Sequence, residues 1–75
     1  MPIGHKLRAL RQGAGLTQIE LAEHTTEHGL KQPRISLIES GGAMPSAVQL
    51  AVILDAVGAT PSERLEVLQG LTGDR

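Results

Sequence analysis

The stretch "LTQIELAEHTTEHGLKQPRISLIESG", residues 16–41, contains the signals for two short helices and the connection between them. Thr17 is followed three residues later by Glu20, the spacing of a capping box, in which the two side chains bond free backbone N–H groups at a helix start. Further on, Ile35 and Ile38 lie one helical turn apart and precede two glycines, which commonly end a helix. The stretch therefore predicts the second and third helices of an all-α chain.

The segment before this stretch predicts a first helix. Ile3, Leu7 and Leu10 follow the i, i+4, i+7 spacing of a single buried stripe. The stripe ends near the Gly-Ala-Gly of residues 13–15, where we expect the helix to stop.

The segment after it predicts two more helices, each opened by its own capping box. Ser46 with Gln49 opens a fourth helix, and Thr60 with Glu63 opens a fifth over about residues 61–70. Strand-like alternation is absent throughout. The apolar positions expected to face the core are Ile19, Leu21 and Ala22 in the second helix, Leu50, Ile53, Leu54 and Val57 in the fourth, and Leu65 and Leu68 in the fifth.

The composition sets limits on what this chain can do. Its 75 residues predict a single domain over 1–75, and the absence of cysteine excludes disulfides and thiolate metal ligands. The absence of Phe, Tyr and Trp excludes base stacking on aromatic side chains, the usual means of binding single-stranded nucleic acid. No apolar run approaches the roughly 18 residues of a membrane span, so we expect a soluble cytoplasmic protein without a membrane partner.

Charge is distributed unevenly along the chain, although the net charge is only −1. Residues 1–38 contain five Lys or Arg and three Glu, giving +2. Residues 39–75 contain two Arg and five acidic residues, giving −3. We therefore expect an anionic partner to meet the N-terminal half.

His24, Glu27 and His28 spell His-x-x-Glu-His, a short pattern found in one class of zinc peptidases. A peptidase also needs a third ligand and a substrate cleft, which a few short helices in 75 residues hardly supply. We interpret the cluster as the exposed end of a helix and predict neither an enzyme nor a metal site.

A series of short blocks appears in a defined order along the chain: Leu16-Thr17-Gln18, Glu20-Leu21-Ala22, Ile35-Ser36, Ile38-Glu39, Gly41 and Pro45-Ser46. In this order they resemble the Xre/Cro/phage-repressor type of helix-turn-helix domain, over about residues 5–60. The resemblance implies a compact five-helix, lambda-repressor-like fold in which helices two and three form the motif. It implies no cofactor.

In such domains the third helix enters the DNA major groove, where its first residues meet base edges. The resemblance implies that the base-contacting residues are Gln32, Pro33, Arg34, Ser36 and Leu37. Gln32 can bond an adenine edge at two points, and Arg34 can reach guanine or a phosphate. Pro33 and Leu37 can offer only apolar contact, for instance to a thymine methyl group.

The resemblance also assigns residues that steady the third helix. It implies phosphate contacts by Thr17, Gln18, Lys31 and Arg11. It further implies an ion pair between Arg11 and Glu39 that joins the first helix to the third.

Two features depart from the usual pattern between helices two and three. About three extra residues lie within 25–28, and they form either an added turn of the second helix or a longer loop. Proline disfavours helical geometry in the residue before it, so we expect the third helix to begin at Pro33 with Gln32 as its cap.

The outward positions of the fourth helix, commonly charged in this family, are Val48 and Val52. Either the fifth helix folds over them, or they form a two-fold dimer contact together with Leu68 and Leu71. We predict the dimer, because a small domain without disulfides or metal gains stability from a second copy.

We therefore predict a sequence-specific double-stranded DNA-binding regulator, a repressor or autoregulator that binds a pseudo-palindromic operator as a homodimer. The alternative is an antitoxin-like or other protein-interaction module that keeps the fold, takes a protein partner and binds DNA weakly or not at all.

Overall fold

The computed structural model describes residues 3–72, and the side chains of residues 3–69. Within this range the chain forms five α-helices, one short 3-10 helix and no strand. Their bounds are α1 Ile3–Gly13, α2 Gln18–Thr25, η1 Thr26–His28, α3 Gln32–Ser40, α4 Ala47–Ala56 and α5 Pro61–Thr72. The predicted all-α, five-helix fold is confirmed. None of these described helices is long and apolar enough to cross a membrane.

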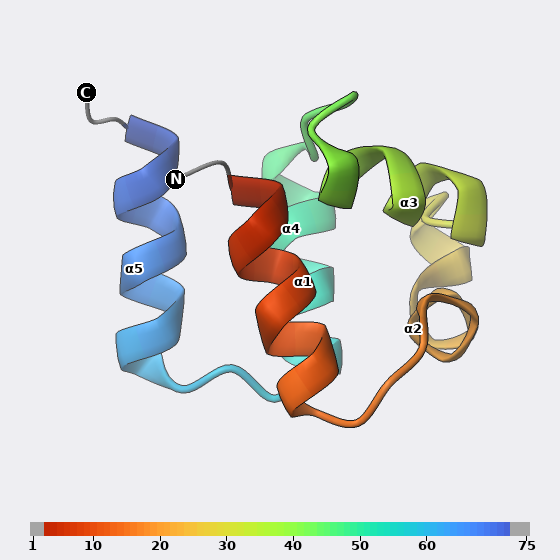
Figure 1. Ribbon diagram of the computed structural model, residues 1–75, viewed down its shortest axis with the longest axis horizontal. Helices are drawn as coiled ribbons and strands as arrows, with labels where there is room; N and C mark the ends of the chain where they lie inside the picture. Colours follow the sequence, from red (N-terminus) through yellow and green to blue (C-terminus); the bar gives the residue numbers. More distant parts are fainter. Residues whose placement is uncertain (1–2, 73–75) are drawn as a thin grey trace.

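Helix α1 lies in the middle of the molecule, with α5 at one end and the pair α2 and α3 at the other (Figure 1). It packs against both α3 and α5, while α2 packs against α3 and α4. Because α1 separates them, α3 and α5 face different surroundings at opposite ends of the domain.

All three predicted capping boxes are formed. Thr17 Oγ1 accepts a hydrogen bond from the backbone N–H of Glu20 at 3.0 Å, and Glu20 Oε1 accepts one from the backbone N–H of Thr17 at 2.8 Å. The same reciprocal bonds join Ser46 with Gln49 and Thr60 with Glu63. These bonds satisfy backbone donors that a helix start leaves free, which is why the starts of α2, α4 and α5 were predictable from sequence.

The core is entirely aliphatic and α5 contributes less to it than expected. Val67 of α5 is only 1% exposed, whereas Leu65 and Leu68, predicted to face the core, are 56% and 49% exposed. Ile19 of α2, also predicted as a core residue, is 64% exposed. Successive helical residues point about 100° apart. A helix that buries Val67 therefore directs Leu65, two positions earlier, to nearly the opposite side and Leu68, one position later, to its flank. The buried apolar residues are Leu7, Leu21, Ala22, Leu30, Ile35, Ile38, Leu50, Ile53, Leu54, Ala59 and Val67.

Gly4 allows α1 to approach α3 closely. A β-carbon added to Gly4 would lie 2.3 Å from the carbonyl oxygen of Ile38 and 2.6 Å from that of Glu39. These distances are far below van der Waals contact with backbone atoms, so only glycine fits here without a shift of one helix. Gly4, Leu7 and Arg11 are the buried residues of α1 and lie on one face of that helix.

The extra residues between α2 and α3 form an added turn rather than an open loop. Helix α2 ends at Thr25 and continues directly into η1, which closes at Gly29 in a left-handed conformation. Thr25 is fully buried, and its hydroxyl is within donating distance of two carbonyl oxygens, that of Leu21 at 3.0 Å and that of Leu30 at 2.9 Å. The threonine thereby joins the end of α2 to the segment that leads into α3.

Helix α3 begins one residue earlier than expected. Lys31 is its extended N-cap residue, Gln32 is the first helical residue and Pro33 the second. The prediction that Gln32 caps a helix starting at Pro33 is therefore wrong. Proline disfavours helical geometry in the residue before it but does not forbid it. The N–H that Pro33 lacks would have had no hydrogen-bond partner within the helix, because it belongs to the first turn.

Candidate nucleic-acid interface

Arg11 of α1 and Glu39 of α3 form the two-point ion pair that the resemblance implies. Arg11 Nε donates to Glu39 Oε2 at 2.7 Å, and Arg11 Nη2 donates to Glu39 Oε1 at 3.0 Å. The third nitrogen, Nη1, donates to the carbonyl oxygen of Leu16 at 2.7 Å. Both side chains are buried, at 8% and 5% exposure. The guanidinium thus fixes α1, α3 and the start of α2 to one another.

The ion pair continues outward through two glutamines. Gln18 Nε2 donates to Glu39 Oε1 at 3.1 Å, and Gln32 Nε2 donates to Gln18 Oε1 at 2.8 Å. Gln18 and Gln32 are the first residues of α2 and α3, and both are half-buried. The row Gln32–Gln18–Glu39–Arg11, called here the polar row, therefore runs from the outer start of α3 into the core. The bond between the glutamines was not predicted, although both occupy the same position at a helix start.

The polar row leaves Gln32 able to bind a further partner. One of its two amide hydrogens is donated to Gln18, so the other hydrogen and the carbonyl oxygen Oε1 remain for hydrogen bonding. A neighbouring donor and acceptor form the pair that an adenine edge requires in the major groove.

The other predicted base-contacting residues differ in their exposure. Pro33 is exposed and Leu37, one turn further along α3, is 50% exposed. Ser36 is half-buried. The inner side of α3 carries Ile35 and Ile38, each 1% exposed. The predicted positions therefore lie away from the core, on the side of α3 that a partner can reach.

Arg34 is held by the polypeptide itself. Its Nη2 donates to the carbonyl oxygen of Met44 at 3.0 Å and approaches Oε1 of Gln49 at 3.4 Å. The guanidinium therefore braces the connection between α3 and α4 rather than extending freely from the start of α3. The sequence places Arg34 among the base-contacting residues, and the observed bonds give it a structural partner in addition.

Three described cations have no ion pair within residues 3–69: Arg34, whose hydrogen bonds are given above, Lys31 and Arg8. Lys31 precedes α3 and Arg8 lies on α1, and both are exposed. Lys6 and Arg64, by contrast, pair with Glu66 and Asp55 at 2.5 and 2.8 Å. Lys31 is the free positive charge nearest to the start of α3. Thr17, also predicted to contact a phosphate, has both its hydroxyl and its backbone N–H hydrogen-bonded to Glu20 in the cap of α2.

His24 and His28, which the sequence places in a His-x-x-Glu-His pattern, lie in two different helical segments. His24 is in α2 and His28 in η1, and both are exposed. Among the described residues there is no group of three His, Cys, Asp or Glu side chains that could hold a metal ion. The change from α to 3-10 geometry between them also alters the i, i+4 relation that would bring two helical histidines together.

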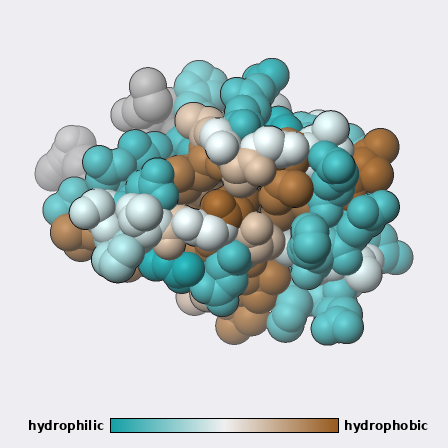
Figure 2. Space-filling view, turned by 90° about the horizontal axis from the view of Figure 1, so that it is seen from below, coloured by the Kyte–Doolittle hydropathy of each residue, from teal (hydrophilic) through white to brown (hydrophobic). Residues whose placement is uncertain are grey.

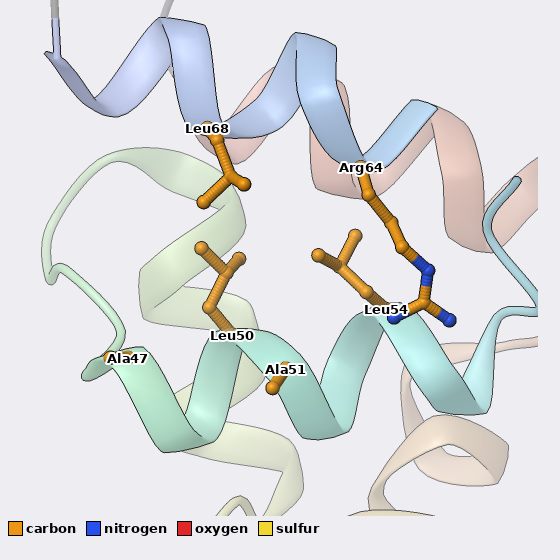
Figure 3. Close-up of a pocket in the computed structure, with 6 residues that line it drawn as sticks. All are labelled: Ala47, Leu50, Ala51, Leu54, Arg64 and Leu68. Carbon is orange, nitrogen blue, oxygen red and sulfur yellow. The ribbon is translucent and has the colours of Figure 1, made fainter. Parts of the chain in front are cut away.

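An apolar groove lies between α4 and α5, on the side of α1 away from α3. It encloses about 240 Å³ and is lined by Ala47, Leu50, Ala51, Leu54, Arg64 and Leu68. Leu68 points from α5 toward Leu50 of α4, with Leu54 beside it, and the small Ala47 and Ala51 complete the α4 part of the lining (Figure 3). Apolar residues also gather across the middle of the face seen in Figure 2, between hydrophilic flanks.

The residues predicted to form a dimer contact differ in their exposure and in their relation to this groove. Val48 is 63% exposed, so α5 does not fold over it. Val52 is half-buried and packs against the core. Leu68 lines the groove, and the side chain of Leu71 lies outside the described residues.

A helix steadied at its start by a second helix, with a polar first turn directed outward, defines the helix-turn-helix class of domain. The chain matches the helix-turn-helix domain family over residues 2–67, and it belongs to that family. No curated protein and no solved structure matches it. Membership of this typically non-enzymatic family confirms the resemblance drawn from the sequence and indicates a DNA-binding regulator.

Proposed function

We propose that this protein binds specific sequences of double-stranded DNA as a homodimer and regulates transcription there, as a repressor or autoregulator. The polar row is the observation that supports this most. A buried ion pair holds Gln18, and Gln18 holds Gln32, so the outermost amide is oriented before any partner arrives. Orientation in advance reduces the entropy lost on binding.

In the proposed complex α3 lies in the major groove with Gln32 against an adenine edge. Gln18 contacts a phosphate with its remaining amide hydrogen while supporting Gln32. Lys31 and the free N–H groups at the start of α2 add further phosphate contacts. Arg11 is only 7% exposed, so its contribution is to hold the row in place.

Two copies would place their α3 helices about 34 Å apart, in successive major grooves of a pseudo-palindromic site. The dimer contact proposed for this arrangement is the side of the domain with Val48 and the α4–α5 groove. Its support is the exposed valine and the open apolar lining contributed by Leu68. Binding through two subunits also compensates for the small number of free cations on each one.

The test is a titration of labelled duplexes, selected from a random pool, at several salt concentrations. One cationic phosphate contact per subunit, from Lys31, gives a dimer a log–log slope of affinity against salt of about −1.8. Gln18→Ala should weaken binding about tenfold or more, because it removes a phosphate contact and the support of Gln32. Gln69→Ala, an exposed glutamine on α5, is the matched control and should leave affinity unchanged.

A second candidate is a module that binds another protein through the α4–α5 groove and keeps the fold without binding DNA. The apolar groove and the pairing of Lys6 and Arg64 with acidic residues favour it. Failure to select any duplex, or an affinity independent of salt, would support this candidate and contradict DNA regulation.

A further inference from the structure

The outer side of α3 carries an apolar pair that the core does not use. Pro33 and Leu37 are four residues apart, so they lie on the same side of the helix, and both are exposed. Leu37 is 50% exposed, while Ile38 beside it is 1% exposed in the core. Leu37 is therefore an apolar side chain directed away from the interior.

Gly42, which has no side chain, lies beside Leu37 and does not cover it. A β-carbon at Gly42 would lie 3.2 Å from Cδ2 of Leu37, so the leucine rests against the turn that ends α3. The side chain thus has a fixed neighbour on one side and open space outward. Leu37 is therefore available for apolar contact with a molecule that approaches α3 from outside.

No charged side chain within α3 is free to compete with this pair for the base edges, because Arg34 and Glu39 are both hydrogen-bonded. Arg34, the only cation within α3, is bonded to the carbonyl oxygen of Met44 and lies near Gln49. Two-point recognition of guanine by arginine would require breaking those bonds. After the free cation Lys31, the outer side of α3 therefore offers the amide of Gln32 and the half-buried hydroxyl of Ser36. The remaining surface is the apolar pair Pro33 and Leu37.

We propose that Pro33 and Leu37 recognise the 5-methyl groups of pyrimidines, next to the adenine bound by Gln32. This inference rests on the proposed function of α3 as the DNA-binding helix. The thymine methyl is the apolar group that base pairs display in the major groove. Pro33 and Leu37 are about 6 Å apart along the helix axis, which is close to two base-pair steps, so each can meet a different methyl group.

The same chemistry extends to a modified base. 5-Methylcytosine displays its methyl group at the same ring position as thymine, although its hydrogen-bonding edge differs. At a position contacted by Leu37, methylation of cytosine would strengthen binding rather than block it. Each methyl buried against the helix should be worth roughly a three- to fivefold change in affinity.

The experiment replaces single thymines of a selected duplex by deoxyuridine, which removes only the methyl group. We expect a three- to fivefold loss of affinity at one or two positions in each half-site. Leu37→Ala should bind the thymine and uracil duplexes equally at one such position. Leu65→Ala, an equally exposed leucine on α5, should keep the full difference, and circular dichroism verifies that both variants fold. A second arm places cytosine and 5-methylcytosine at the sensitive position, and the methylated duplex should bind more tightly.

Each result bears on one claim or the other. Duplexes that bind equally with and without every methyl group would overturn methyl recognition and leave the DNA-binding function intact. A Leu37→Ala variant that keeps its preference for thymine would overturn the role of that residue. Failure to select any duplex would remove both proposals together.

Discussion

The two ends of this domain are organised by opposite means. At the α2–α3 end, buried and half-buried polar side chains from three helices are joined by hydrogen bonds of 2.7–3.1 Å. On the α4–α5 side, apolar side chains line a groove of about 240 Å³, and the ion pair between Asp55 and Arg64 is partly exposed to solvent. One end has fixed side chains and the other has unfilled space.

In this 75-residue domain, one region orients the side chains of the proposed DNA-binding helix, and a different region offers apolar surface to a second subunit or partner. Hydrogen bonds depend on direction, so a connected row orients the outer start of α3 in a way that packing alone does not. Apolar contact depends mainly on area, so an open groove suits a partner that supplies matching surface. Four substitutions test this contrast, in order of decreasing effect.

The largest effect is expected for Glu39→Ala. The change leaves the Arg11 guanidinium buried without its partner, which costs about 3–5 kcal/mol of unfolding free energy. Chemical denaturation followed by circular dichroism measures the loss, since the chain has no Trp. The matched control is Asp55→Ala, which breaks an exposed pair and should cost less than about 1 kcal/mol. Equal losses in the two variants would mean that the ends are not organised differently.

Gly4→Ala tests the close approach of α1 to α3 behind the polar row. The added methyl meets two backbone carbonyls, so we expect a loss of about 1–3 kcal/mol, as for overpacking of a core. Gly13→Ala in the same helix meets nothing within 4 Å and should be neutral or stabilising by up to about 1 kcal/mol. If both substitutions stabilise the protein, the two helices are not in contact at Gly4.

Leu68→Glu tests the opposite side of the contrast. A carboxylate in the apolar groove should weaken the proposed dimer about tenfold, or about 1.4 kcal/mol, with little change in monomer stability because Leu68 is half-exposed. Sedimentation equilibrium gives the dissociation constant. Gln69→Glu adds the same charge to the neighbouring exposed position and serves as the control. Dimers that persist equally in both variants would place the contact elsewhere.

Thr25→Val gives the smallest expected effect and concerns the added turn. The isosteric change removes a buried hydroxyl that bridges Leu21 and Leu30, at a cost of about 1 kcal/mol. Thr26→Val, at the adjacent exposed position, should change stability by less than about 0.5 kcal/mol. A thermal unfolding series compares the two, and no difference between them would show that the turn does not depend on this hydroxyl.

The local signals in the sequence were sufficient for the helices and their order. Capping boxes place α2, α4 and α5 correctly because the bonding partners are only three residues apart. The start of α3 was misplaced by one residue because the preference before Pro33 was outweighed by the geometry of the turn.

Local sequence signals do not predict which residues of α5 are buried or how the side chains of the candidate site are bonded. Helix α5 has leucines at 65 and 68 and a valine at 67, and the choice of the valine depends on how α1 meets the helix. The bonds from Arg34 to Met44 and from Gln32 to Gln18 join residues 10 and 14 positions apart, so they follow from tertiary packing. The resemblance supplied Arg11 and Glu39, which are 28 positions apart, where local pattern alone would not.

The most direct test of the account is an NMR titration of the ¹⁵N-labelled protein with a selected duplex. We expect the largest amide shifts at the start of α2 and along the outer side of α3, from Lys31 to Leu37. Helix α5 should shift little apart from any change caused by dimer formation. Shifts concentrated on α4 and α5, with α3 unchanged, would contradict the assignment of the polar row to DNA binding.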